Sequence, residues 1–247
     1  MTKTLQHVLI LGATSDVARA LAAKFASENF ALTLGARDED KLAVMAADLH
    51  IRYNVPVYTA RFDALDFKSH YAFYHSMAHK PTVVICVFGL LGDQPAAQND
   101  WDHAALIIDS NYTGAASILN VIAHDFEKLQ DGTIVGISSV AGERGRQSNY
   151  FYGSAKAGFT AYLSGLRNRL YKSGVHVLTV KPGFIKTRMI EGMKTPGPLT
   201  ASPEIVANKI YKAVKSRKNV IYVLPIWQLV MFVIRQIPEG IFKKLKL

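Results

Sequence analysis

The sequence has little cysteine and no apolar run long enough to span a bilayer. Cys86 is its only cysteine, and it lies within the apolar stretch TVVICVFG. A single thiol excludes a disulfide framework inside the chain and fits a reducing compartment. The stretch MTKTLQHVLILGATS passes from polar residues straight into an apolar run, unlike a signal peptide. We therefore expect a cytoplasmic protein in which Cys86 is a small core residue.

Acidic residues are scarce relative to basic ones. The chain holds 19 Asp and Glu against 29 Lys and Arg, for a formal net charge of +10. This excess favours an anionic partner such as a phosphate or an acidic lipid. The basic residues are scattered and form no nucleic-acid reader motif, so we expect no nucleic-acid partner. His75 and His79 have no third residue at a suitable ligand spacing, so we expect no metal site.

Short apolar runs alternate with segments of helical length and period. The runs cover residues 7–12, 31–36, 55–60, 82–89, 132–139, 175–183 and 219–223, and the helical segments include 15–28, 39–49 and 102–129. Continuous apolar strands separated by helices are typical of a parallel sheet that is buried on both faces. We predict an α/β fold with a doubly wound, parallel, seven-stranded sheet (a Rossmann fold) over residues 1–225, followed by an apolar helical tail over 226–247. Ligands of such a fold bind beyond the carboxyl ends of the strands.

The stretch GATSDVARALA, which begins at Gly12, resembles the glycine-rich turn of a dinucleotide-binding fold. Gly12 stands at the first glycine position, but Asp16 and Ala18 replace the next two glycines. Thr14 and Ser15 can cap the helix that follows, and a helix N-terminus attracts phosphate. Asp16 would bring negative charge near that phosphate, so we expect it to bond backbone amides of the turn instead. Alone, the stretch fits either a nucleotide loop or an ordinary strand–helix turn.

Two residues after neighbouring strands bear on the cofactor. Arg37 follows the second predicted strand, where an acidic residue would bind the ribose 2′-hydroxyl of NAD. A small residue followed by arginine better suits the 2′-phosphate of NADP, so we favour NADP(H) and keep NAD(H) as the alternative. Asp63 follows the third strand and could accept the adenine amino group. The competing interpretations are a solvated arginine at a helix start and an ordinary helix N-cap.

A serine, a tyrosine and a lysine are spaced for proton transfer. Ser139 ends the fifth predicted strand, Tyr152 follows thirteen residues later, and Lys156 comes four residues after Tyr152, on the same helix face. A carbonyl reduced by hydride needs a proton for its growing oxyanion. A tyrosine with a pKa near ~10 is a poor acid–base at neutral pH, and a neighbouring ammonium lowers that pKa.

Two further roles complete this constellation. Ser139 can hydrogen-bond the substrate oxygen, and Asn111 in DSNYTG can hold a water that links Lys156 to solvent. The alternative is an ordinary tyrosine–lysine helix pair. The strand-end serine, the asparagine and the downstream stretch KPGFIKT together favour the catalytic interpretation.

These motifs resemble the short-chain dehydrogenase/reductase family over nearly the whole chain. The resemblance implies catalytic Asn111, Ser139, Tyr152 and Lys156. The non-enzyme alternative is a nucleotide-sensing member of the family, and the presence of Ser139, Tyr152 and Lys156 argues against it. The residues expected at the cofactor are Gly12, Thr14, Ser15, Asp16, Val17, Arg37, Asp63, Gly89, Tyr152, Lys156, Pro182, Gly183 and Thr187. The sequence departs from the family pattern in the glycine turn and in VFGLLGD, which keeps only Gly89 of the usual asparagine–alanine–glycine segment.

Several stretches resemble a narrower subgroup of reductases. FGLLGD, NYTGAAS, PGFIKTRM and MFVIRQIPEGIFKKLKL are similar to reductases of a 2-keto-pentose carried on a polyprenyl phosphate in bacterial cell-wall synthesis. The resemblance implies that substrate, a flavin oxidase partner that forms the ketone, and NADH as the subgroup's cofactor. A soluble ketone or another lipid-linked sugar is the alternative substrate. Arg144, Arg146, Lys186 and Arg188 would then surround a phosphate, unless some are solvated loop charges. Residues 192–203 suit a mobile substrate lid.

The tail combines apolar residues with lysines. The run IWQLVMFVI at 226–234 is short of the roughly 20 residues that span a bilayer. It is followed by a mixed segment in which Ile241, Phe242 and Leu245 alternate with Lys243, Lys244 and Lys246. Such a pattern suits a helix on an anionic membrane surface, here the inner membrane. The alternative is a helix packed on the domain or at a subunit interface of a homo-oligomer.

Overall fold

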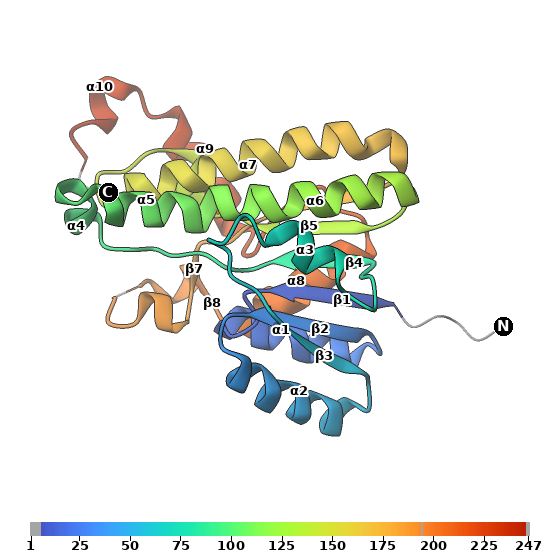
Figure 1. Cartoon of the computed structure of the whole chain (residues 1–247). Coiled ribbons are helices and arrows are strands. Elements are labelled where there is room, and N and C mark those ends of the chain that lie inside the picture. The colour runs from blue at the N-terminus through green and yellow to red at the C-terminus, as the bar shows by residue number, and fades with distance from the viewer. Residues whose placement is uncertain (1–5, 194, 246–247) are drawn as a thin grey trace.

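The computed structural model describes residues 6–193 and 195–245 and contains a seven-stranded parallel sheet (Figure 1). The strand order is β3-β2-β1-β4-β5-β6-β9. The strands are β1 (His7–Leu11), β2 (Ala31–Ala36), β3 (Val57–Arg61), β4 (Val83–Cys86), β5 (Thr133–Ile137), β6 (His176–Lys181) and β9 (Val220–Tyr222). Each predicted apolar run overlaps one of them. The doubly wound fold is therefore confirmed, and the order reverses between β1 and β4, where such sheets bind ligands.

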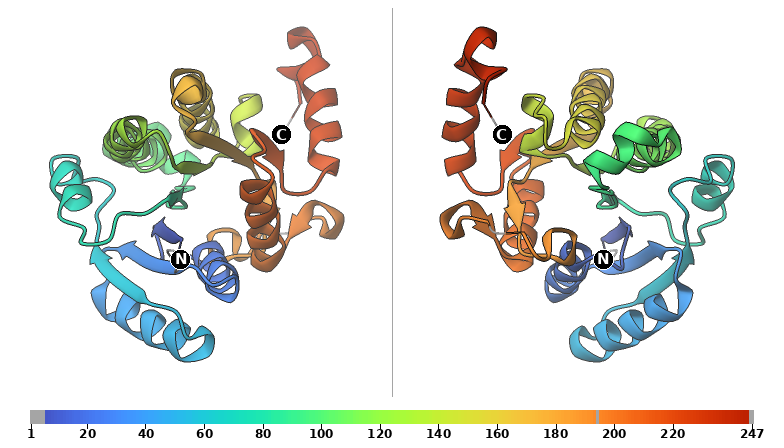
Figure 2. Two further views of the ribbon diagram at one scale, coloured as in Figure 1. Left: turned by 90° about the vertical axis from the view of Figure 1, so that its right-hand side faces the viewer. Right: turned by 90° about the vertical axis from the view of Figure 1, so that its left-hand side faces the viewer.

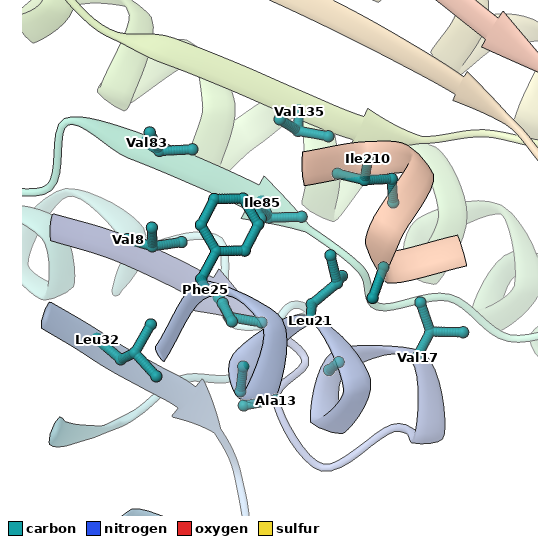
Figure 3. Close-up of a cluster of buried hydrophobic side chains, with 14 of the residues drawn as sticks. Val8, Ala13, Val17, Leu21, Phe25, Leu32, Val83, Ile85, Val135 and Ile210 are labelled. Atoms are coloured by element: carbon teal, nitrogen blue, oxygen red, sulfur yellow. The ribbon is translucent and has the colours of Figure 1, made fainter. Parts of the chain in front are cut away.

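Helices cover both faces of the sheet because successive strand residues point to opposite sides. In β1, Val8 and Ile10 belong to one core cluster, and Leu9 and Leu11 to the other. The first cluster lies under α1 (Asp16–Ser27), α2 (Glu39–Tyr53) and α8 (Pro203–Lys215), and the second under α3 (His70–His75), α6 (Gly114–Leu129) and α7 (Tyr150–Leu170). Figure 3 shows Phe25 of α1 and Ile210 of α8 among the side chains of the first cluster. Cys86 is a free, buried thiol, as predicted.

The long helix expected over 102–129 is divided into three parts. It consists of α5 (Trp101–Ile108), a π-helical turn (Asp109–Thr113) and α6. A short helix, α4 (Gln94–Asn99), precedes it. A π turn adds one residue to the helical ring and often occurs at functional sites. Here it contains Asn111, whose side chain is turned into the protein and is 1% exposed.

A second, two-stranded sheet was not predicted from the sequence. β7 (Phe184–Ile185) pairs in parallel with β8 (Thr200–Ala201) and closes the segment between them into a loop. Residues 192–203, the predicted lid, include most of the second half of that loop, β8 and the start of α8. Lys194 in this range lies outside the described residues, and lid mobility stays a prediction.

The tail packs on the domain through one side. α9 (Ile226–Gln236) and α10 (Glu239–Phe242) run along one edge of the molecule, beside the turn that follows β5 (Figure 2). Trp227 and Met231 are buried against Val140 in a separate apolar cluster. In the two described stretches, no helix is long and apolar enough to cross a membrane. Lys246, one of the lysines noted in the tail, lies outside them.

Candidate active site

The turn after β1 requires a glycine at its first position. Gly12 has a φ of +86°, and a Cβ at Gly12 would lie 2.8 Å from the Cβ of Phe88. Its backbone N–H donates to the Gly35 carbonyl at 2.8 Å. Ser15 caps α1 as predicted, because its hydroxyl accepts a hydrogen bond from the Ala18 amide at 3.2 Å. The turn thus presents the N-terminus of α1 at the switch point of the sheet.

Asp16 does not bond its own turn, contrary to expectation. Its Oδ2 accepts a hydrogen bond from the backbone N–H of Arg188 at 2.9 Å, and its Oδ1 lies 3.3 Å from Arg188 Nε. The Arg188 guanidinium also donates to the Thr14 carbonyl at 3.1 Å. The carboxylate reaches outward because the turn is already closed by the bond from the Ser15 amide to the Gly12 carbonyl.

The π turn and the end of β4 meet at Asn111. Its Nδ2 donates to the carbonyls of Leu90 at 2.6 Å and Ile107 at 2.8 Å, and its Oδ1 accepts from the Leu90 amide at 3.3 Å. A Cβ at Gly89 would lie 2.6 Å from Asn111 Oδ1 and 3.3 Å from Lys156 Nζ. Asn111, Gly89 and Lys156 are therefore neighbours. Because its amide is engaged with backbone groups, the Asn111 side chain positions this strand end, and a water held by Asn111 that links Lys156 to solvent stays a prediction.

The two serines at the end of β5 have different surroundings. The Ser138 hydroxyl donates to the Lys156 carbonyl at 3.0 Å and lies 2.6 Å from the Thr160 hydroxyl, so it holds α7 against the strand. The Ser139 hydroxyl accepts a hydrogen bond from the Ala141 amide at 3.1 Å. Its own proton can be donated to the neighbouring Tyr152 oxygen or to a substrate oxygen, as a substrate-binding serine requires.

Tyr152 and Lys156 lie on the first turns of α7, beside Ser139. Lys156 Nζ donates to the Ile137 carbonyl at 3.0 Å and lies 5.8 Å from the centre of the Tyr152 ring. Burial lowers the pKa of Lys156 to about 8. Burial also raises the pKa of Tyr152, and a hydrogen bond with Ser139 opposes that shift. Burial is thus the larger effect on the Tyr152 phenol here, and the lowering of its pKa expected from Lys156 stays a prediction.

The segment after β6 borders the same site. The Pro182 carbonyl accepts a hydrogen bond from the Val140 amide at 3.0 Å, which ties the segment to the residue after Ser139. Gly183 comes next, and the Thr187 hydroxyl donates to the Ile185 carbonyl at 3.2 Å. These contacts set the segment across the carboxyl ends of β5 and β6.

Comparison with known proteins decides the family. A family model described as short chain dehydrogenase matches residues 6–196. An uncharacterized oxidoreductase of Mycobacterium tuberculosis is 38% identical over 243 residues, covering 96% of each chain. Another, from Streptomyces coelicolor, is 33% identical and covers 97% of this chain and 96% of its own. The chain belongs to the short-chain dehydrogenase family. It is thus an oxidoreductase.

A solved structure has the same fold. A short-chain dehydrogenase from Sphingobium yanoikuyae, in complex with NADPH, superposes with a TM-score of 0.82 at 24% identity, covering 96% of this chain and 98% of its own. At that identity the likeness concerns the fold. It extends over the C-terminal part of the chain, beyond the stretch matched by the short-chain dehydrogenase model.

The residues expected at the adenosine end of a family cofactor are separate from the catalytic group. Arg37 is exposed just past β2. Asp63 Oδ1 accepts a hydrogen bond from the Leu65 amide at 3.0 Å, so this carboxylate shapes a local turn. Val17 is a residue of α1 whose side chain is buried in the first core cluster. Of these, Arg37 is the most freely placed side chain.

The predicted rim of four cations does not form as expected. Arg144 Nη1 donates to the carbonyls of Ile234 at 3.0 Å and Ile237 at 2.7 Å, and its Nη2 donates to Glu239 at 2.9 Å. Its guanidinium also lies 3.9 Å from the centre of the Phe242 ring. Arg144 is wrong as a phosphate ligand because the last carbonyls of α9 need donors and take its N–H groups.

The other three rim cations differ from one another. Arg146 donates to the sulfur of Met231 at 3.3 Å, and Arg188 pairs with Asp16. Lys186 is exposed, and its backbone amide pairs with β8. Among the four, Arg144 is therefore fully engaged, whereas Arg188, Lys186 and Arg146, whose Nε has no partner in the described structure, keep donors for a ligand.

Sequence reasoning missed Trp227. Its Nε1 donates to the Leu199 carbonyl at 3.0 Å, and its indole occupies the place that a side chain at Gly183 would take. Trp227 thus joins the tail, the loop before β8 and the segment after β6. The available signal was an aromatic residue on the first turn of an apolar run, but that pattern does not indicate which surface the ring covers.

Proposed function

We propose that this oxidoreductase is an NADP(H)-dependent carbonyl reductase that acts on a 2-keto-pentose carried on a polyprenyl phosphate. The observation that carries the reductase chemistry is the group at the carboxyl ends of β4 and β5. There the buried Lys156 lies beside Tyr152, and the Ser139 hydroxyl can donate to the Tyr152 oxygen or to a substrate. These are the side chains that protonate a carbonyl oxygen during reduction.

The residues fit a nicotinamide dinucleotide. The missing side chain of Gly89 leaves a space beside Asn111 and Lys156 that a Cβ would fill. Gly12, with its positive φ, makes the tight turn before the N-terminus of α1 without a side chain in the way. An open helix N-terminus suits a diphosphate. Gly12, Thr14, Ser15 and the Val17 amide would hold that diphosphate, and Gly89, Pro182, Gly183 and Thr187 would border the nicotinamide. When bound, the cofactor supplies the hydride.

The chain's own residues handle the proton. Tyr152 donates its phenolic proton to the substrate oxygen, and its raised pKa keeps that proton in place at neutral pH. Ser139 donates a hydrogen bond to the same oxygen, which stabilises the developing charge. Lys156, whose pKa lies at about 8, returns a proton toward Tyr152. Asn111 positions the end of β4 through Leu90 and Ile107.

Arg37 supports NADPH over NADH. An exposed guanidinium just past β2 suits the 2′-phosphate, which it can bind through two parallel hydrogen bonds. Two structures of similar fold are described with NADPH or NADP, the Sphingobium yanoikuyae dehydrogenase and ElxO. NADH, implied by the narrower resemblance, is the competing cofactor.

The tail supports a lipid-linked substrate. On α9, Trp227 and Met231 face the domain, whereas Leu229, Phe232 and Val233 are more than half exposed. Ile241, also exposed, precedes Lys243 and Lys244. Apolar side chains beside lysines suit the surface of an anionic bilayer. Because α9 packs on Val140, next to Ser139, such a surface would lie near the site, peripheral at the inner membrane.

The deciding assay offers the intact protein two kinds of ketone with NADPH. One is a polyprenyl-phosphoryl 2-keto-pentose in detergent micelles, and the other a panel of soluble ketones that includes the same keto-pentose without its lipid. We expect the lipid-linked sugar to have the highest kcat/KM. Preference for a soluble ketone would overturn the substrate, and absence of reduction of any ketone would overturn the reductase. A flavin oxidase that produces the ketone would be the expected partner.

A further inference from the structure

Asp16 and Arg188 join two segments that are far apart in the sequence. The residues are 172 positions apart, and two contacts connect them, while a third joins Arg188 to Thr14. The Arg188 amide donates to Asp16 Oδ2, the Arg188 Nε lies 3.3 Å from Asp16 Oδ1, and the Arg188 Nη2 donates to the Thr14 carbonyl. The turn after β1 is thereby attached to the start of the loop between β7 and β8.

A carboxylate at this position is unfavourable for a dinucleotide site by itself. Asp16 is the first residue of α1, at the helix end where a diphosphate would bind. Two like charges in such proximity repel each other, and the positive end of one helix offsets only part of that repulsion. The position carries a glycine in the pattern that the turn resembles. A positive charge near the Asp16 carboxylate is therefore needed to offset its repulsion of the diphosphate.

Arg188 supplies the compensating charge and more. Its Nε–H faces Asp16, and one Nη2–H is used by Thr14. Within the described part of the chain, its other three N–H groups have no partner, and its side chain is 67% exposed. Asp16 and Thr14 thus hold the guanidinium in one orientation, with donors left over. A guanidinium fixed in this way suits phosphate oxygens, because less conformational freedom is lost on binding.

We propose that Asp16 and Arg188 act as one unit that binds the diphosphate of the cofactor. Arg188 contacts the diphosphate, and Asp16 is a positioning residue that aims the guanidinium. Where the pattern has the second glycine of the turn, this chain has the carboxylate of Asp16, which is paired with Arg188 from the segment after β7. We call this pair the clamp. The inference rests on the proposed function only in requiring a dinucleotide cofactor.

The test compares four full-length proteins: native, Asp16→Asn, Arg188→Met and the double variant. The dissociation constant of NADPH is measured by titration of its fluorescence, without substrate. Arg188→Met should weaken binding about tenfold or more, because it leaves the Asp16 carboxylate unpaired beside the diphosphate. Asp16→Asn should weaken binding less. The double variant should bind NADPH more tightly than Arg188→Met does, because the repelling charge is gone.

Two controls make the result specific. Lys172→Met removes an exposed cation just before β6, away from the carboxyl ends of the strands, and should change NADPH binding by less than about twofold, a difference typical of a screened surface charge. Adenosine 2′-monophosphate, which has no diphosphate, should bind all four proteins with similar affinity. Circular dichroism melting of each variant shows whether it is folded.

Any one of three results would overturn the proposed role of the Asp16–Arg188 pair. These are unchanged or tighter NADPH binding in Arg188→Met, additive losses in the double variant, and an equal loss of adenosine 2′-monophosphate binding. Tighter binding would mean that the pair closes the site instead of completing it. Because the measurement is binding alone, failure of every ketone in the activity assay would overturn the proposed reductase and leave this result standing.

Discussion

The indole of Trp227 lies directly against Gly183. A Cβ at Gly183 would lie 1.9 Å from Trp227 Nε1, a distance that real side chains do not tolerate. The segment after β6 and the first turn of α9 therefore depend on each other. Removal of the chain after Pro225 would take Trp227 and Met231 out of the core, so point substitutions test the tail more cleanly than truncation does.

Gly183→Ala should displace Trp227. We expect a loss of about 1–3 kcal/mol in the free energy of unfolding, the usual cost of inserting a methyl group into a packed site. Thermal or urea unfolding measures it. Gly197→Ala is the matched control, because no atom lies within 4 Å of a Cβ there. Equal stability of the two variants would contradict the contact.

Tyr152→Phe should remove most of the turnover and leave cofactor binding unchanged. Only the hydroxyl that gives its proton to the substrate is lost, and general acid catalysis contributes about 10²–10⁴-fold. Single-turnover rates with NADPH and the NADPH dissociation constant are measured together. Tyr150→Phe is the control, since Tyr150 is exposed on the same helix. Near-native turnover in Tyr152→Phe would exclude Tyr152 as the acid.

The buried Lys156 should make stability depend on pH. Its pKa is about 8 when folded and near ~10.4 when unfolded, so between these values the unfolded chain binds more protons. The free energy of unfolding of the native protein should therefore rise with pH from about 8 to 10.5, relative to Lys156→Met, by up to about 3 kcal/mol.

Urea titrations of the two proteins across that pH range give the difference directly. Subtracting the variant removes the contribution of other groups, such as tyrosines, that titrate in the same range. A difference that stays flat would show that Lys156 keeps an ordinary pKa, and one that falls as pH rises would show that its pKa is raised; either would contradict the lowered pKa.

Arg37→Ala should reduce the preference for NADPH. Loss of the guanidinium should weaken NADPH binding about tenfold and leave NADH binding within about twofold, because only the 2′-phosphate is affected. Both dissociation constants are measured for native and variant protein. Tighter binding of NADH than NADPH by the native protein would reverse the cofactor assignment.

The exposed side of α9 should bind anionic vesicles. Leu229→Ser with Phe232→Ser should lower co-flotation with vesicles of phosphatidylcholine and phosphatidylglycerol, because both residues point away from the core. Val44→Ser with Ile51→Ser is the control, since these residues are equally apolar and exposed on α2. Unchanged flotation together with a smaller mass by light scattering would instead identify the α9 surface as a contact between copies of the chain.

The local pattern of the sequence was sufficient to predict the sheet and the grouping of Ser139, Tyr152 and Lys156. All seven strands of the larger sheet overlap predicted apolar runs. Ser139 could be placed at a strand end, and Tyr152 and Lys156 could be placed on one helix face from their spacing of four residues. These features depend on side-chain periodicity, which neighbouring residues alone set. Gly12 likewise follows from the tight turn that its positive φ allows.

The tertiary structure alone decided how distant polar groups pair. Arg144, predicted as a phosphate ligand, caps the end of α9, and Asp16 bonds Arg188 across 172 positions. The two-residue strands β7 and β8 are too short to leave a periodic pattern. These side chains and short strands pair with whichever unsatisfied amides, carbonyls and charges lie next to them once the core has formed. The pairing therefore depends on contacts between distant segments and not on the order of residues within one segment.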